Sequence, residues 1–187
     1  MTGYRRRVDD QTVEWLPENE TCAQKAIALT DGSGISDTSE LGSDSRIEVS
    51  DSVASEIREI YDKLSYIARY GSGVDGLTNL TDLKDEYRST ERILSIQATD
   101  GVIEATGSET ITVNLTDGHG TAVPGTYTVF LDVGGRRVDV SISDGSGTTD
   151  VSTEGVPGDS VIVRAVAVQE LDTDRITQPD TLSLEIV

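Results

Sequence analysis

Residues 110–143 read TITVNLTDGHGTAVPGTYTVFLDVGGRRVDVSIS, and this stretch decides the fold. Apolar and polar residues alternate in three successive segments, whose apolar members are Ile111, Val113 and Leu115, then Tyr127, Val129, Leu131 and Val133, then Val138, Val140 and Ile142. Because successive side chains of a strand point to opposite faces, each segment predicts a strand with one buried face. The turn formers Pro124-Gly125 and Gly134-Gly135 lie between the segments and predict tight reversals of the chain.

The period of two begins near Leu94 and continues to the C-terminus. Further strand-like runs cover residues 160–168 and 181–187, and shorter ones lie near Val102 and Val151. Seven or eight short strands separated by turns are typical of an antiparallel β-sandwich. We therefore expect such a sandwich over residues 95–187, with Tyr127 and Phe130 in its core.

The turns of this half resemble those of bacterial immunoglobulin-like (Ig-like) domains of the invasin/intimin kind. Those domains run strand, D-x-x-G-x-x-V-P-G, strand, a glycine pair, strand, D-x-x-G, strand, then G-x-x-x-V-x-A. The same order occurs here in residues 116–125 (TDGHGTAVPG), Gly134-Gly135, residues 143–150 (SDGSGTTD) and residues 158–166 (GDSVIVRAV). The resemblance implies an Ig-like fold and a role in display or adhesion, and it implies no chemistry.

A helical pattern precedes the strands, in residues 50–94. Apolar residues recur at spacings of four, three, four and three, at Val53, Ile57, Ile60, Leu64 and Ile67. This spacing lays one apolar seam along a helix, which the glycine-rich residues 71–76 should end. A looser second period from Leu77 to Leu94 predicts a helical hairpin. Isoleucine-rich seams favour trimers or larger bundles, so we expect docking or oligomerisation through this seam, with packing on the chain's own neighbouring helix as the alternative.

Residues 1–49 show no sustained period, and residues 31–45 are rich in Gly, Ser and Asp. We interpret them as an extended, irregular N-terminal arm. Trp15 is the candidate anchor of this arm on a partner, because a large aromatic side chain is costly to leave in water. Intramolecular packing of Trp15 on the following helices is the alternative.

Charge excludes one class of partner. The 187 residues include 34 acidic and 15 basic side chains, a formal net charge of −19, and only three of the basic residues are lysine. Such a surface repels phosphate, so we expect no nucleic-acid partner. The Asp-rich, Lys-poor composition resembles that of proteins from extremely halophilic archaea and their viruses. In molar salt the repulsion between carboxylates is screened, and we expect weaker folding at low salt.

The sequence predicts no membrane insertion and no export signal. No stretch approaches the 18 consecutive apolar residues of a membrane helix. The Arg5-Arg6 pair is followed by polar residues where a twin-arginine signal needs an apolar segment. We therefore expect the protein to be assembled first inside a cell.

Few residues are of the types that catalysis or zinc binding requires. Cysteine and histidine occur once each, as Cys22 and His119, which excludes an intrachain disulfide and a Cys/His zinc site within one chain. The sequence contains no G-x-S-x-G, P-loop or H-E-x-x-H motif. We expect no enzyme, no catalytic residue and no cofactor, with His119 in an exposed turn.

Calcium is the one ion that the carboxylates could hold. Pairs such as Asp172/Asp174 and Asp117/Asp144 offer the oxygen ligands that Ca²⁺ prefers. Such pairs also arise by chance in a chain with 34 acidic residues. We therefore assign no metal site.

All three asparagines of the chain open an N-x-T acceptor for glycosylation, at Asn19, Asn79 and Asn114. The strand register turns Asn114 away from the core, as a glycan requires. The three asparagines are thus candidate glycosylation sites, although no export signal accompanies them.

An arm, a helical hairpin and a sandwich together are typical of assembly proteins. We expect a structural component of a haloarchaeal tailed virus, in the tail, baseplate or head decoration, assembled in the host cytoplasm. Its expected partners are further copies of the chain, neighbouring virion proteins and the host surface. The alternative is a cell-surface or adhesion subunit. A carbohydrate-binding module is a third reading, which the small number of aromatic residues in the sandwich disfavours.

Overall fold

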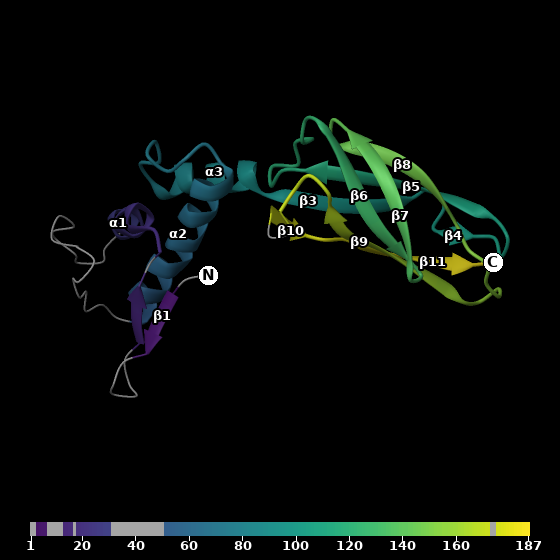
Figure 1. Ribbon diagram of the computed structural model, residues 1–187, viewed down its shortest axis with the longest axis horizontal. Coiled ribbons are helices and arrows are strands. Elements are labelled where there is room, and N and C mark those ends of the chain that lie inside the picture. Colours follow the sequence, from purple (N-terminus) through teal and green to yellow (C-terminus); the bar gives the residue numbers. More distant parts are fainter. Residues whose placement is uncertain (1–2, 7–12, 17, 31–50, 173–174) are drawn as a thin grey trace. The chain divides into compact units, whose positions relative to one another are not determined.

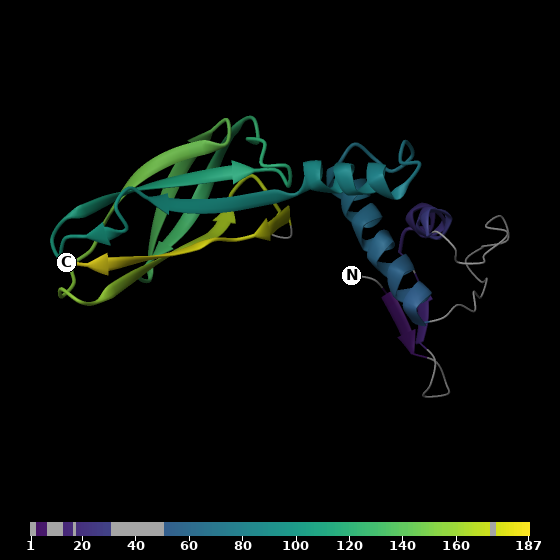
Figure 2. The same ribbon diagram turned by 180° about the vertical axis from the view of Figure 1, so that it is seen from behind.

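The computed structural model describes residues 3–6, 13–16, 18–30, 51–172 and 175–187. The described part contains three helices and eleven strands. Figures 1 and 2 show that most of it is β structure. The elements are β1 (Gly3–Arg6), β2 (Val13–Leu16), α1 (Glu20–Leu29), α2 (Asp51–Tyr70), α3 (Leu80–Thr90), β3 (Arg92–Ala98), β4 (Val102–Ile103), β5 (Ser108–Thr116), β6 (Thr126–Val133), β7 (Arg136–Ser143), β8 (Ser146–Ser152), β9 (Ser160–Val168), β10 (Ile176–Gln178) and β11 (Thr181–Ile186). The chain divides into two compact units, Met1–Tyr87 and Arg88–Val187, which we call the helical unit and the sandwich unit.

The helical unit is built on α2, whose apolar seam packs against α1 and the segment that leads into α3. Ile57, Ile60, Leu64 and Ile67 are at most 5% exposed. Their buried neighbours come from both flanking segments and include Cys22, Ala26, Ile27, Val74, Leu77 and Leu83. The helix α2 ends at Tyr70, where Gly71 N–H donates to the Ile67 carbonyl at 2.7 Å and the glycine-rich turn begins. A separate hairpin pairs β1 with β2 in antiparallel register.

Two boundaries differ from the expected organisation. Residues 20–29, expected within an irregular arm, form α1, because Asn19 caps the helix and a stripe of small residues such as Ala23 and Ala26 becomes buried. Short alanine-rich stripes give little hydrophobic periodicity, so the sequence pattern did not reveal this helix. Leu94, expected at the end of the hairpin, lies in β3, since the helix α3 ends at Thr90.

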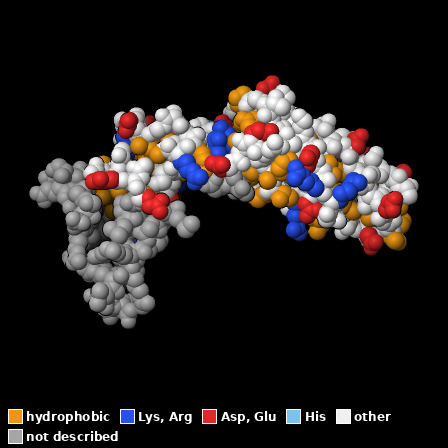
Figure 3. All heavy atoms as spheres, viewed as in Figure 1, with side chains coloured by type: hydrophobic (Ala, Val, Ile, Leu, Met, Phe, Trp, Pro, Cys, Tyr) orange, Lys and Arg blue, Asp and Glu red, His pale blue; other side chains and the backbone are white. Residues whose placement is uncertain are grey.

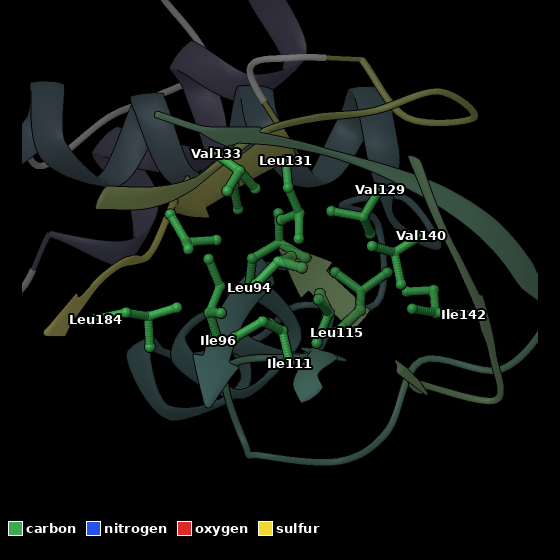
Figure 4. Close-up of a cluster of buried hydrophobic side chains, with 14 of the residues drawn as sticks. Leu94, Ile96, Ile111, Leu115, Val129, Leu131, Val133, Val140, Ile142 and Leu184 are labelled. Carbon is green, nitrogen blue, oxygen red and sulfur yellow. The ribbon is translucent and has the colours of Figure 1, made fainter. Parts of the chain in front are cut away.

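The sandwich unit is one nine-stranded sheet of sandwich- or barrel-like form, in the strand order β10-β3-β5-β8-β7-β6-β9-β11-β4. The alternation predicted for residues 110–143 is confirmed, because Ile111, Val113, Leu115, Val129 and Ile142 are fully buried. Their side chains meet in one apolar interior (Figure 4). The expectation that Phe130 lies in the core is wrong, since Phe130 alternates with the buried residues Val129 and Leu131 and is half-buried on the outer face.

The sheet is curled so strongly that it is almost closed. β7 and β8 share a single pair, Ser143 with Ser146, across a turn in which Asp144 has a φ of 50° and Gly145 a φ of 86°. Beyond this turn β8 pairs with β5 and β7 pairs with β6, so the sheet bends there. Gly147 allows the close approach, because a Cβ at this position would collide with the Ser141 carbonyl oxygen.

On the side of the sheet opposite this turn, two segments of the chain, β3 to β4 and β10 to β11, pass from one half of the sheet to the other. β3 pairs with β5 and β10, and the chain then continues into β4, which pairs with β11 in parallel. In the same way β10 leads into β11 through Pro179, a residue that cannot donate a ladder hydrogen bond. The two terminal strands of the sheet, β10 and β4, are both short. They leave little free edge with which another chain could pair.

Candidate functional site

The isoleucine seam that the sequence analysis proposed for docking is covered within the chain. Ile57, Ile60, Leu64 and Ile67 all belong to the core of the helical unit. These side chains are buried without a second copy of the chain. This agrees with the alternative expectation, in which the seam packs on neighbouring segments of its own chain. Val53 lies in the first turn of α2 and Trp15 in β2, and both side chains are outside the described part.

A cluster of tyrosines lies beside the seam, on α2 and α3. The rings of Tyr66 and Tyr70 have centroids 5.0 Å apart at an interplanar angle of 64°, an edge-on contact. Tyr66 also packs on Tyr87, with 5.3 Å between the ring centroids. All three side chains are half-buried. We call Tyr66, Tyr70 and Tyr87 the tyrosine cluster; it holds three of the eight aromatic residues of the chain.

Two cations flank the tyrosine cluster. The guanidinium carbon of Arg69 lies 4.8 Å from the ring centroid of Tyr70, and Lys63 Nζ lies 6.0 Å from that of Tyr87. Both distances fall in the range of cation–π attraction. Lys63 also pairs with Glu59 at 2.6 Å, and this hydrogen bond lowers the pKa of the Glu59 carboxyl.

Tyrosine and arginine are the residue types most enriched where protein interfaces concentrate their binding energy. A tyrosine ring offers a large apolar area with little conformational entropy to lose, and its hydroxyl can still find a polar partner. The tyrosine cluster is therefore the candidate docking surface of the helical unit. The cluster was not predicted from the sequence, although the i, i+4 spacing of Tyr66 and Tyr70 off the isoleucine seam is a signal that indicates it.

Two of the candidate glycosylation asparagines are helix caps. Asn19 Oδ1 accepts from Cys22 N–H at 3.1 Å at the start of α1. Asn79 Oδ1 accepts from the N–H groups of Thr81 and Asp82, at 2.8 and 3.0 Å, at the start of α3. Asparagine is a preferred cap because its side-chain oxygen satisfies otherwise unpaired helix N–H groups. The asparagines of these two sequons thus stabilise the first turns of α1 and α3.

The third asparagine, Asn114, lies on β5. Its Oδ1 accepts from Ser146 Oγ at 2.9 Å on the neighbouring strand β8, and its side chain is half-buried. The side chain points away from the core, since its chain neighbours Val113 and Leu115 are both fully buried. Asn79, in contrast, is exposed.

The carboxylates considered for calcium serve the turns in which they lie. Asp117 Oδ1 accepts from the N–H groups of His119 and Thr121, at 2.9 and 2.8 Å. Asp144 Oδ1 accepts from Gly125 N–H at 3.1 Å. Of the pair Asp172/Asp174, Asp174 lies outside the described residues. Within the described ranges no group of three or more His, Cys, Asp or Glu side chains is arranged to hold a metal ion.

Of the remaining sequence candidates, His119 is exposed in the turn after β5, as expected. Cys22 is fully buried in the helical unit, and this burial raises the pKa of its thiol, which suppresses thiolate chemistry. Among the described helices, none combines the length and apolarity that a membrane crossing requires.

Comparison with known proteins gives no family. No family model matches the sequence, and no curated protein matches it. Among solved structures, the CARDB domain of a Pyrococcus furiosus protein, solved in complex with di-metal ions, is similar over 52% of this chain and 88% of that domain, at 16% identity and a TM-score of 0.34. An endo-β-1,4-mannanase from Thermotoga petrophila is similar over 74% of this chain but 25% of its own, at 14% identity and a TM-score of 0.33.

Proposed function

We propose that this chain is a non-enzymatic structural component of a virion, which docks through its helical unit and projects its sandwich unit as an Ig-like domain. The observation that carries the proposal is the tyrosine cluster with its flanking cations, on a unit whose apolar core is separate from that of the sandwich. The assembly that the composition favours is a haloarchaeal tailed virus, with the chain in its tail, baseplate or head decoration.

The division of roles between the units supports this proposal. Each unit has its own buried core, so one can be held in an assembly while the other remains folded and exposed. The turn pattern shared with invasin/intimin-type domains supports the Ig-like assignment, and such domains act by presenting surfaces and loops. A part of this kind requires positioned contacts rather than a catalytic group.

Charge supports a saline environment for the assembly. With a net charge of −19, copies packed side by side repel one another strongly in dilute buffer. At molar ionic strength the Debye length falls to roughly 3 Å, and this repulsion is screened. A lattice or ring of such chains is therefore stable in high salt and weakened by dilution.

A subunit of a cell surface is the second candidate, and the exposed sequon at Asn79 favours it. Glycans would mark a chain that has passed through an export route. The Ig-like sandwich would then display a binding surface on the cell rather than on a particle.

Fractionation of the source culture tests the proposal. Particles purified on a density gradient in high salt are digested, and peptides of this chain are quantified against those of the major virion proteins. We expect a fixed, stoichiometric amount in the particles. Enrichment in the cell envelope with glycan mass on Asn79 would favour the second candidate, and absence from the particles would refute the virion assignment.

A further inference from the structure

The outer face of the sheet formed by β7, β6, β9 and β11 differs from the rest of the sandwich surface. The face is defined by the side chains Phe130, Asp132, Arg137, Ile162, Arg164 and Val166, and we call it the Phe130 face. Val166 is 57% exposed and Ile162 is 42% exposed, two of the few large apolar side chains on the described surface. Figure 3 shows basic side chains over these strands, with hydrophobic side chains beside them.

Phe130 lies under a cation on this face. The guanidinium carbon of Arg137 is 3.6 Å from the centroid of the Phe130 ring, a close stacking contact. Arg137 is held there by Asp139, whose two carboxylate oxygens accept from Nε at 2.7 Å and from Nη2 at 3.2 Å. A β-bulge lies opposite, since Phe130 pairs with Ala167 and Leu131 with Ala165, and the extra residue is Val166. The bulge thus presents Val166 beside Phe130.

The outer face of these four strands is closer to neutral than the sandwich unit as a whole. Residues 88–187 contain 16 acidic and 6 basic side chains, a net charge of 6 − 16 = −10. On the Phe130 face Arg137 and Arg164 are offset by Asp139 and Asp132, and Glu185 on β11 adds one further negative charge at the edge of the face. Arg164 is exposed and forms no ion pair with any other residue that the structure describes. Its guanidinium is thus available to a carboxylate from outside the chain.

The register makes this face complementary to itself. Asp132 on β6 lies directly opposite Arg164 on β9. Two residues earlier on β6, Phe130 lies opposite Ala167 and beside the bulged residue Val166. Consider a two-fold axis that runs parallel to the strands, between β6 and β9. It stacks β6 of one copy on β9 of the other, so that each Asp132 faces Arg164 of the second copy and each Phe130 faces Val166 of the second copy.

We propose that the Phe130 face is a dimerisation surface that binds the same face of a second copy of this chain. Isologous pairing of this kind is the commonest form of protein self-association. Two sandwiches of charge −10 repel one another less across this nearly neutral face than an average part of their surface would, and the two Asp132–Arg164 contacts fix the register. The proposal concerns the sandwich alone and does not depend on a virion or on docking by the helical unit.

The face is smaller than the interface of a typical stable complex. Four strands about 4.8 Å apart and about eight residues long give a footprint of about 500 Å² per copy. Stable interfaces bury about 800 Å² per partner. The dimer should therefore be reversible, with a population that rises with protein concentration, and at low salt it should be weakened by the repulsion between the acidic units.

A matched pair of variants tests the surface. Val166→Asp places a carboxylate at the centre of the face, and Val156→Asp places one at a site that is 66% exposed in the loop between β8 and β9. The full-length chain is measured by multi-angle light scattering over a concentration series in about 2 M salt. We expect Val166→Asp to keep the mass of a monomer at every concentration, and Val156→Asp to show the same rise of mass with concentration as the wild type. Equal masses for the two variants, or a wild-type mass that does not depend on concentration, would overturn the proposal.

Charge reversal tests the register and guards against loss of folding. Asp132→Arg and Arg164→Asp each place like charges against each other in both contacts, so each variant alone should be unable to dimerise. An equimolar mixture restores two opposite-charge contacts in a heterodimer, and its mass should rise toward that of the wild type. A mixture no heavier than its separate components would contradict the proposed pairing. Recovery of mass on mixing also shows that both variants are folded.

Discussion

The carboxylate of Asp180 accepts a hydrogen bond from the backbone N–H of Ile96 at 2.8 Å, across 84 residues of sequence. This contact joins the two segments that leave one half of the sheet for the other, β3 on the way to β4 and β10 on the way to β11. The other carboxylate oxygen of Asp180 accepts from Thr181 N–H at 2.8 Å, and the Asp180 carbonyl accepts from Ala165 N–H at 3.0 Å. Asp180 therefore satisfies backbone groups at the place where the ladders are interrupted.

Removal of this carboxylate should destabilise the sandwich unit. Hydrogen bonds to a charged group contribute about 1.5–3 kcal/mol, so we expect Asp180→Ala to lower the free energy of unfolding by about 2 kcal/mol. Denaturant unfolding of the full chain measures this change. Glu154→Ala, in the exposed loop after β8, is the control and should have little effect. Equal stability of the two variants would show that Asp180 does not hold the crossing together.

A charge in the sandwich core should prevent folding of that unit. Val113 is fully buried on β5, so Val113→Asp leaves an unpaired carboxylate in an apolar interior and should cost several kcal/mol. Thr148→Asp, on the adjacent strand β8, is exposed and should be tolerated. Circular dichroism of both variants is the measurement. A β-type spectrum retained by Val113→Asp would contradict the register.

The helical unit should unfold without the sandwich. Ile60 is 5% exposed in the core of the helical unit, and Ile60→Asp should remove the amide protection of α2. Because the sandwich has a separate core, its strands should keep their protection. Hydrogen exchange resolved by peptide tests both statements in one sample. Loss of protection in β5 and β6 would show that the two cores are coupled.

The cap of α3 makes part of the stability dependent on pH. Hydrogen bonds from the side chain and the backbone N–H of Thr78, joined by one from Asn79, lower the pKa of the Asp82 carboxyl from its ordinary value of 3.8. A lowered folded-state pKa stabilises the fold above that ordinary value, and the stabilisation is lost as the pH falls through the folded-state pKa.

Asp82→Asn should therefore lower the unfolding midpoint of the helical unit at pH 7. The difference from the wild type should shrink as the pH falls below about 4. Thermal unfolding of both chains at several pH values measures it. Asn79→Ala, which removes the cap itself, should cost about 1 kcal/mol at pH 7, and most of this cost should persist below about pH 4 because the N–H groups of Thr81 and Asp82 lose their acceptor at any pH. A deficit of Asp82→Asn that did not change with pH would exclude the proposed charge effect.

The sequence predicted the parts of the fold that follow from local periodicity. Alternation identified the buried residues of β5, β6 and β7, and the spacing of Ile57, Ile60 and Leu64 identified the buried face of α2. A periodic pattern shows that a face must be covered, but it does not show by what. The seam was therefore compatible with a second copy, whereas the structure covers it with α1 and the segment leading to α3.

The features that sequence reasoning missed depend on contacts between distant residues. Phe130 was expected in the core because it is large and apolar, yet the register places it outside, where Arg137 covers the ring. The role of Asp180 requires knowledge that β3 and β10 are neighbours, and nothing local to residue 180 indicates this. In the same way Tyr87 joins Tyr66 and Tyr70 only when α3 packs on α2.

The most direct test of the central claim is hydroxyl-radical footprinting of the chain in intact particles and free in the same high salt. If the helical unit docks through the tyrosine cluster, Tyr66, Tyr70 and Tyr87 should be labelled much less in the particle than in the free chain. Val156, on the projecting sandwich, should be labelled equally in both. Unchanged labelling of the three tyrosines, or particles without the chain, would contradict the account.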